Sequence, residues 1–297
     1  MKDNEFLYGW TSDGLRLEGN HWPADKKDIC VICTHGMSGN IIENYFAVVL
    51  GQKLSKDGVG FIYGHNRGYN HINDIRTREK KNGGYITRRI GVAYERFKEC
   101  IYDIDLWISQ AKKLGYKKII LMGHSLGCNK TLYYYSIKKP KNVVGIILAS
   151  PPDMVGLGEI PKYEPHHNQL LKEAENNVKN NKPREIIGRQ VWEWYGLSSQ
   201  TFLDLFSRNG PADNLPIYHN PKDFPQLSNI SIPIMVFIGE KDDVIIKTLK
   251  EDLELLKSKA KSCKNFTTAI IKNAVHTYDD EEEAVSSLIS KWIKKNF

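Results

Sequence analysis

The segment from Lys118 to Gly127 constrains the fold more than any other part of the sequence. The apolar run 118–122 predicts a strand, and it leads directly into Gly-His-Ser-Leu-Gly at 123–127, which a helix-compatible segment follows. Glycines two residues on either side of Ser125 remove the Cβ atoms that would collide with a neighbouring strand and helix. A serine at the apex of a sharp strand-to-helix turn is the context that a nucleophile elbow requires.

A pair of carboxylates follows a second predicted strand. The apolar run 232–238 breaks at Gly239, and Asp242 and Asp243 come directly afterwards. Catalytic groups of open parallel sheets collect at the carboxyl ends of the strands. Either carboxylate therefore qualifies as the group that orients a catalytic base, although both also suit a solvated turn or a helix N-cap.

A candidate base lies beyond the next predicted strand. Residues 268–271 form a short strand pattern, and His276 falls in the loop that follows it. A serine hydroxyl is a poor nucleophile at neutral pH unless an adjacent base, itself held by a third group, accepts its proton. A lone loop histidine is more often a surface residue, but the position of His276 at a strand end and after Ser125 in the chain favours the catalytic role.

The loop after the predicted central strand 29–34 supplies a candidate oxyanion hole. His35-Gly36-Met37 follows this strand, and the glycine allows a backbone N–H, that of Met37, to face the pocket. The N–H of Leu126, next to the nucleophile, would be the second donor. The simpler interpretation is that His35-Gly36 only turns the chain.

Together these motifs resemble the α/β-hydrolase superfamily, over nearly the whole chain except its middle. The resemblance implies a mostly parallel central sheet flanked by helices, with the triad order Ser, Asp, His. It also favours Asp242 over Asp243, because the third position after such a glycine usually holds the acid. Two further segments, 66–70 (Asn-Arg-Gly-Tyr-Asn) and 93–97 (Ala-Tyr-Glu-Arg-Phe), are similar to an esterase-like branch that includes fungal siderophore esterases.

Alternating strand and helix patterns surround these motifs and predict a parallel sheet with right-handed crossovers. A turn at 12–14 predicts an amino-terminal hairpin, and the charged stretch 76–89 predicts an exposed loop or hairpin. The expected elements are strands at 6–10, 15–22, 29–34, 59–63, 118–122, 143–150, 232–238 and 268–271, and helices at 45–56 and 97–114.

The pattern changes after Pro151-Pro152, where strand signals give way to polar helical stretches with an aromatic group. We predict a core formed by 1–152 and 226–297, with a helical cap inserted at 153–225. Trp192 and Trp194 are candidate pocket residues, although most aromatics of this segment would form its own small core. His35, His65 and Arg67 are further pocket candidates, and Arg67 suits a structural ion pair equally well.

Composition excludes several classes of function. The 297 residues are 41% hydrophobic and 26% charged, which is ordinary for a globular enzyme. The net charge of +7 comes from lysines spread along helices without a nucleic-acid-binding motif, so we expect no nucleic-acid partner. No stretch is long and apolar enough to span a membrane, and the polar N-terminus lacks a signal-peptide core, so a cytoplasmic location is expected.

Five scattered cysteines indicate buried free thiols. Cys30 and Cys33 have the spacing of a redox pair, but residues three apart on a strand point to opposite faces, so a disulfide or a shared metal is not expected. No histidine, cysteine or carboxylate cluster has metal-ligand spacing, and no cofactor is predicted. The sequence does not indicate an oligomeric state.

These patterns predict a serine hydrolase that transfers an acyl group from a small-molecule substrate to Ser125 and then to water. Ester hydrolysis is the leading reaction, because it makes the smallest chemical demand on such a site. Thioester hydrolysis and acyl transfer to another acceptor use the same groups, as does amide hydrolysis, which is less favoured. A ligand receptor without catalytic activity is the alternative of a different class, and substrate identity depends on the cap.

Overall fold

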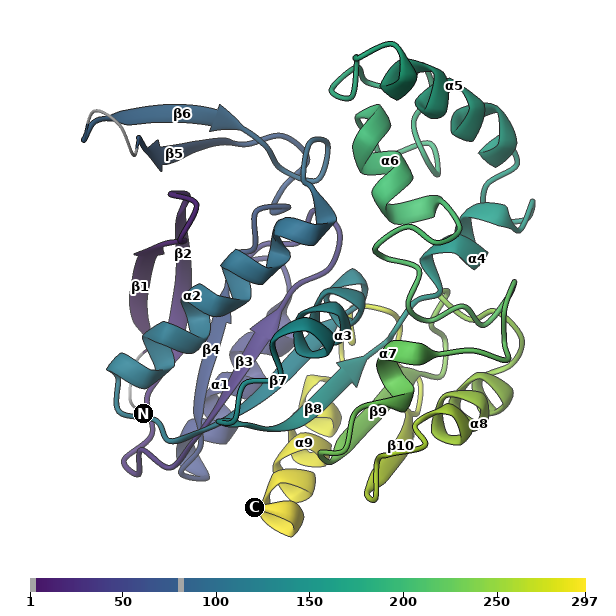
Figure 1. Ribbon diagram of the computed structural model, residues 1–297. Coiled ribbons are helices and arrows are strands. Elements are labelled where there is room, and N and C mark those ends of the chain that lie inside the picture. The colour runs from purple at the N-terminus through teal and green to yellow at the C-terminus, as the bar shows by residue number, and fades with distance from the viewer. Residues whose placement is uncertain (1–3, 80–82) are drawn as a thin grey trace.

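An eight-stranded sheet forms the centre of the protein in the computed structural model, which describes residues 4–79 and 83–297 (Figure 1). Residues 1–3 of the polar N-terminus and residues 80–82 of the predicted charged loop lie outside the described part. In spatial order the strands are β1 (Glu5–Trp10), β2 (Arg16–Trp22), β4 (Gly60–Gly64), β3 (Ile29–Thr34), β7 (Lys118–His124), β8 (Val143–Ala149), β9 (Ile234–Gly239) and β10 (Phe266–Ile271).

Most neighbouring strands of this sheet are parallel, as predicted. Only β2 is antiparallel to its neighbours, β1 and β4, and the β1–β2 pairing confirms the predicted amino-terminal hairpin. The charged stretch forms a second, two-stranded sheet from β5 (Asp74–Arg78) and β6 (Tyr85–Arg89), which Figure 1 shows projecting beside β1 and β2.

Helices cover both faces of the large sheet. The apolar layer on one face includes residues of α1 (Tyr45–Lys56) and α9 (Glu282–Asn296). The layer on the other face includes residues of α2 (Cys100–Lys113), α3 (Leu126–Lys138), the short α7 (Pro225–Ser228) and α8 (Leu249–Lys259). A short 3-10 helix, η1 (Phe97–Glu99), precedes α2.

The central strand β3 is buried on both sides, because the two helical layers sandwich it. All six of its residues are buried, which explains its continuous apolar pattern. Cys30 packs in the layer of α2 and α3, whereas Cys33 packs in the layer of α1 and α9. The two thiols therefore lie on opposite faces of the sheet, as predicted, and both are free.

The strand order brings two distant loops together. The chain passes from β3 to β4 on one side of it and later returns to β7 on the other side, so the order reverses at β3. Ligands of open parallel sheets bind beside the strand ends at such a switch point. Thr34 pairs with Gly123 at the carboxyl ends of these strands. The loop that carries Met37 therefore lies next to the turn that carries Ser125.

A helical segment, residues 153–225, lies between β8 and β9 in the chain and extends beyond the carboxyl ends of the strands (Figure 1). It contains α4 (Met154–Glu159), α5 (His167–Lys179) and α6 (Ser199–Phe206). Apolar side chains of these helices, including the fully buried Phe202 and Phe206, pack into a separate cluster. The cluster also includes Val92, Phe97 and Leu126, so these aromatic side chains hold the segment together and pack it against the rest of the protein.

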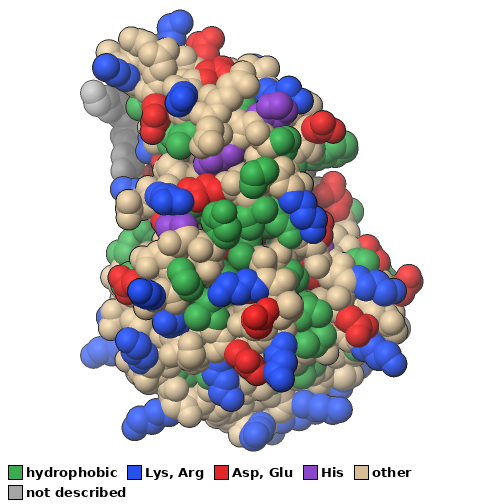
Figure 2. Space-filling view, turned by 90° about the vertical axis from the view of Figure 1, so that its right-hand side faces the viewer, with side chains coloured by type: hydrophobic (Ala, Val, Ile, Leu, Met, Phe, Trp, Pro, Cys, Tyr) green, Lys and Arg blue, Asp and Glu red, His purple; other side chains and the backbone are tan. Residues whose placement is uncertain are grey.

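Charged side chains of both signs cover the outside. Figure 2 shows lysines and arginines scattered over one face, with acidic side chains among them and apolar side chains gathered near the middle. This face carries no continuous basic patch of the kind that binds a phosphate backbone. Within residues 4–79 and 83–297, none of the helices combines the length and the apolar character that a membrane crossing requires.

Candidate active site

Ser125 lies at a strained turn between β7 and α3. Its backbone angles, φ 55° and ψ −131°, fall outside the regions that L-residues ordinarily adopt, and its N–H donates a 2.9 Å hydrogen bond to Ala149 O. A Cβ on Gly123 would lie 2.3 Å from Gly127 O, and one on Gly127 would lie 2.1 Å from Thr34 O. Both glycines are therefore required by close backbone contacts, as the sequence predicts for an elbow.

Gly127→Ala is expected to destabilise the fold by about 3 kcal/mol or more, because backbone atoms of β3 must move to admit the methyl group. The higher helix propensity of alanine, about 1 kcal/mol, offsets only part of this loss. Urea unfolding of both proteins measures the difference. Gly84→Ala is the matched control, since a Cβ there meets no atom within 4 Å; equal stability of the two variants would contradict this account of the turn.

His276 and Asp242 form a hydrogen-bonded pair beside this turn. His276 Nδ1 lies 2.9 Å from Asp242 Oδ1 and 4.0 Å from Asp243 Oδ1. The Asp242 side chain is fully buried, whereas that of Asp243 is 84% exposed. The geometry therefore favours Asp242 as the orienting acid, and it leaves Nε2 of His276 available to a second partner.

The electrostatic environment favours protonation of His276. Burial lowers the pKa of His276, but the hydrogen bond and charge of Asp242, with the charge of Asp243, raise it above the ordinary histidine value. Burial raises the pKa of Asp242, but the hydrogen bond and charge of His276, with hydrogen bonds from Ser150 and the Val244 N–H, outweigh this effect and lower it. By contrast, burial lowers the pKa of His124 to about 3 and that of His65 to about 4. Among these three histidines only His276 has a pKa suited to a base that gains a proton during turnover.

Three residues that the sequence analysis did not single out support this pair. Ser150 Oγ donates to Asp242 Oδ2 and also lies within hydrogen-bond distance of the Tyr278 hydroxyl. His124 Nε2 donates to the carbonyl of His276 over 2.8 Å, and the two rings lie 5.0 Å apart. Because His124 adjoins Ser125, this contact fixes the histidine loop next to the turn.

The loop after β3 approaches Ser125 closely. A Cβ on Gly36 would lie 2.7 Å from Ser125 Cβ and 3.0 Å from Ser125 Oγ, so only glycine allows the loop to pass here. The next residue, Met37, lines the cavity in front of Ser125 that is described below. Leu126 is the first residue of α3, and the first N–H groups of a helix have no acceptor within the helix. The two predicted donors thus belong to the loop that passes Ser125 and to the helix that begins directly after it.

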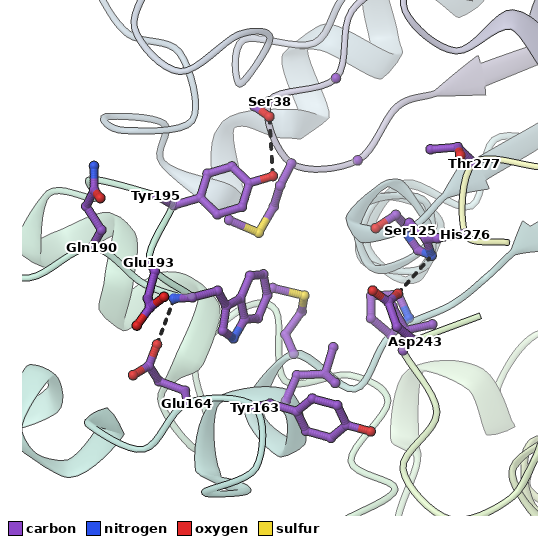
Figure 3. Close-up of a pocket in the computed structure, with 18 of the residues that line it drawn as sticks. Ser38, Ser125, Tyr163, Glu164, Gln190, Glu193, Tyr195, Asp243, His276 and Thr277 are labelled. Atoms are coloured by element: carbon purple, nitrogen blue, oxygen red, sulfur yellow. Dashed lines mark hydrogen bonds and ion pairs between the residues drawn. The ribbon is translucent and has the colours of Figure 1, made fainter. Parts of the chain in front are cut away.

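A cavity of about 730 Å³ opens in front of Ser125 and His276. Its walls come from the loop after β3 on one side and from residues 162–166, 189–190, 192–193 and 195 of the helical segment on the other. Figure 3 shows Ser125, His276, Asp243 and Thr277 at one side of this cavity, with Tyr163, Gln190, Glu193 and Tyr195 across from them. The apolar wall includes Met37, Pro152, Met154, Leu157, Trp192 and Val244.

Two of the predicted pocket residues after β4 do not line this cavity. His65 is buried and stacks on Tyr69 at 4.0 Å. Arg67 is fully buried; it lies 2.9 Å from Asp103 and also pairs with Asp13 and Glu99. The pocket assignment of both residues is corrected, and the alternative for Arg67, a structural ion pair, is confirmed.

The predicted pocket roles of His35 and Trp194 are corrected as well. His35 begins the loop after β3 and is fully buried there, where its Nδ1 bonds Gly36 O at 2.9 Å. Trp194 is 63% exposed and packs edge-on against His71. Trp192 does line the cavity, together with Glu193, and both residues have positive φ in a tight turn.

One group among the described residues has three side chains close enough to share a metal ion: Asp242, Asp243 and His276. Its hydrogen bonds do not fit a ligand set. Asp242 already accepts hydrogen bonds on both carboxylate oxygens, and the proton on His276 Nδ1 that donates to it blocks that nitrogen as a ligand. The arrangement suits a base held by an acid.

Comparisons with solved structures find the same architecture over the full length. Est1E from Butyrivibrio proteoclasticus is 16% identical and has a TM-score of 0.64, with 98% of each chain covered. A monoglyceride lipase from Saccharomyces cerevisiae is 16% identical with a TM-score of 0.65, covering 100% of this chain and 96% of its own. DcsB is 13% identical with a TM-score of 0.69 over 99% of each chain. These likenesses show the fold, which is that of the α/β hydrolases.

No curated protein matches the chain. A family model does match residues 87–295, and its description is "Protein of unknown function (DUF1749)". This range includes the turn at Ser125, both candidate acids and His276. The chain therefore belongs to the DUF1749 family and has the α/β-hydrolase fold.

Proposed function

We propose that the protein is a serine hydrolase that cleaves a carboxylic ester of a small molecule through an acyl-enzyme. The observation that carries this proposal is the convergence of three segments on one cavity: the strained turn with Ser125, the His276–Asp242 pair at 2.9 Å and the loop with Met37. Each part is what nucleophilic acyl transfer needs.

In the first half of the reaction, His276 accepts the Ser125 proton on Nε2 as Oγ attacks the substrate carbonyl carbon. The carbonyl π bond breaks, and the resulting oxyanion accepts hydrogen bonds from the N–H groups of Met37 and Leu126. Asp242 stays ionised and stabilises the imidazolium. Collapse of the intermediate expels the alcohol oxygen, which takes the proton from His276 and leaves the acyl group on Ser125.

In the second half, water takes the place of the alcohol. His276 accepts a proton from the water as its oxygen attacks the acyl carbon, and a second oxyanion forms at the same two N–H groups. Collapse releases the carboxylic acid and returns the proton to Ser125 Oγ. The helical segment 153–225 serves in this proposal as a cap, because its residues form the wall facing Ser125 and set which esters fit.

An ester is the preferred substrate class, since the similar structures include proteins named as esterases and a lipase. A thioester or another acyl acceptor would use the same groups. The five free cysteines suit a reducing compartment, so a cytoplasmic location remains part of the proposal.

A panel of p-nitrophenyl esters and acyl thioesters of increasing chain length tests the substrate class. We expect hydrolysis of esters with a preference set by chain length, and loss of all activity in Ser125→Ala. Faster turnover of thioesters would identify the thioesterase alternative. Stoichiometric binding of these compounds without turnover by folded protein would instead favour a receptor.

The rate of ester hydrolysis is expected to rise with pH, with an inflection above about 6.5, because only neutral His276 accepts the serine proton. Asp243→Asn should move this inflection to lower pH, since the Asp243 charge raises the pKa of His276. The profile of kcat/KM against pH measures both values. Glu254→Gln, which removes an exposed carboxylate on α8, is the control; an inflection that stays in place or rises in Asp243→Asn would contradict the assignment.

A further inference from the structure

A chain of buried polar contacts runs from the helix of the nucleophile to the loop after β3. Lys130 lies on α3, five residues after Ser125, and its side chain is fully buried. Its ammonium donates to Glu95 Oε2 over 2.7 Å and to Asn66 Oδ1 over 3.0 Å. Neither Lys130 nor Asn66 lines the cavity described above.

Asn66 carries this chain onward to His35. The Asn66 side-chain amide donates to His35 O over 3.0 Å, and the Asn66 backbone N–H donates to His35 Nε2 over 3.0 Å. Because Nε2 accepts, the proton of the neutral ring must be on Nδ1, which donates to Gly36 O over 2.9 Å. Gly36 is the residue that passes Ser125 and immediately precedes Met37.

The charges fit this arrangement. Burial, and then the positive charge of Lys130, hold the pKa of His35 well below its ordinary value, so the ring stays neutral with its single proton on Nδ1. A protonated ring would turn Nε2 into a donor facing the Asn66 N–H, and the contact would break. Buried ion pairs such as Lys130–Glu95 are a weak source of stability, which calls for another reason for this one.

We propose that Lys130 and Asn66 are positioning residues for the oxyanion hole: through His35 and Gly36 they hold the Met37 N–H in register with Ser125. Lys130 thereby connects α3, the helix that begins next to Ser125, to the loop that carries the Met37 N–H. This inference rests on the proposed function, because it concerns stabilisation of the transition state in acyl transfer. Loosening the loop should lower kcat and leave substrate binding nearly unchanged.

Lys130→Met and Asn66→Asp test the proposal with a p-nitrophenyl ester as the substrate. Both are expected to lower kcat by about 10- to 100-fold while KM changes by less than about 3-fold, as expected when a donor shifts slightly from its working position. The rate of Ser125 labelling by a fluorophosphonate should fall in parallel. If Lys130→Met fails to fold because Glu95 remains as an unpaired buried charge, Lys130→Met/Glu95→Gln removes both charges and is expected to show the same loss in kcat.

Tyr134→Phe is the matched control. Tyr134 is also a buried residue of α3, and its hydroxyl donates to Asp105 over 2.6 Å, away from the loop after β3. It should lower the melting temperature without lowering kcat. The inference is overturned if the Lys130 and Asn66 variants lose no more kcat than this control, or if KM alone rises. If wild-type protein neither hydrolyses esters nor takes the label, the proposed function fails, and this inference fails with it.

Discussion

Ser125→Ala is expected to lower kcat for ester hydrolysis by at least about 10⁴-fold, because alanine has no oxygen to form the acyl-enzyme. The loss should fall on kcat rather than on KM, since the cavity keeps its size and its other walls. The backbone of the turn has the same positive φ with either residue, so the free energy of unfolding should change by less than about 1 kcal/mol. Steady-state kinetics and urea unfolding of the same preparations measure the two effects.

Ser136→Ala is the matched control for this variant. Ser136 lies on the same helix, α3, and its hydroxyl donates to Tyr133 O over 2.8 Å, several turns away from the nucleophile. We expect wild-type kcat in this control. If Ser125→Ala retained activity within about tenfold of wild type, the acyl-enzyme mechanism at Ser125 would be wrong.

Asp242→Asn is expected to lower kcat by about 10³- to 10⁴-fold, whereas Asp243→Asn should change it only a few-fold. Asp242 accepts hydrogen bonds from His276 on one oxygen and from Ser150 on the other. The asparagine amide offers one acceptor and one donor, so it leaves one of these partners facing a donor and favours the wrong tautomer of His276.

The two asparagine variants control for each other, because they remove the same charge from adjacent residues. Asp243 is mostly exposed and lies 4.0 Å from His276, so it affects the base only through its charge. Kinetics at a pH well above the inflection separate loss of orientation from a shift in pKa. A larger loss in Asp243→Asn than in Asp242→Asn would assign the acid to the neighbour.

The features that could be predicted from the sequence are those that a short segment determines. The turn at Ser125 requires glycines within two residues of it, and β3 must be apolar throughout because both of its faces are buried. His276 and the acidic pair come soon after predicted strands. The ends of these strands were therefore sufficient to predict that the three residues lie at one edge of the sheet. Only the resemblance distinguished Asp242 from Asp243, because the side chain of a loop residue can point either into the site or into solvent.

Contacts between distant segments left no such signal. Ser150 and Asp242 are 92 residues apart in the chain. In the sequence, a serine after a strand such as β8 has the pattern of an ordinary turn residue. His65 and Arg67 follow a strand end, as functional residues often do, but their side chains pack within the protein: Arg67 finds three carboxylates there. Nothing local to the sequence reveals these partners.

The helical segment was the hardest part to predict in detail. Trp192 and Glu193 turn the chain with positive φ although neither is a glycine or an asparagine, so the usual markers of such a turn are absent. The turn is closed by hydrogen bonds between Val191 and Tyr195, and Glu164 accepts from the Trp192 N–H over 2.8 Å. Trp192 lines the cavity, whereas Trp194 lies on the surface.

Mass spectrometry after treatment with a fluorophosphonate tests the central claim most directly. A serine activated by His276 and facing the cavity should take one label, peptide mapping should locate it at Ser125, and Ser125→Ala should take none while Ser136→Ala is labelled like wild type. Absence of labelling in folded wild-type protein, or labelling that persists in Ser125→Ala, would contradict the assignment of Ser125 as an activated nucleophile.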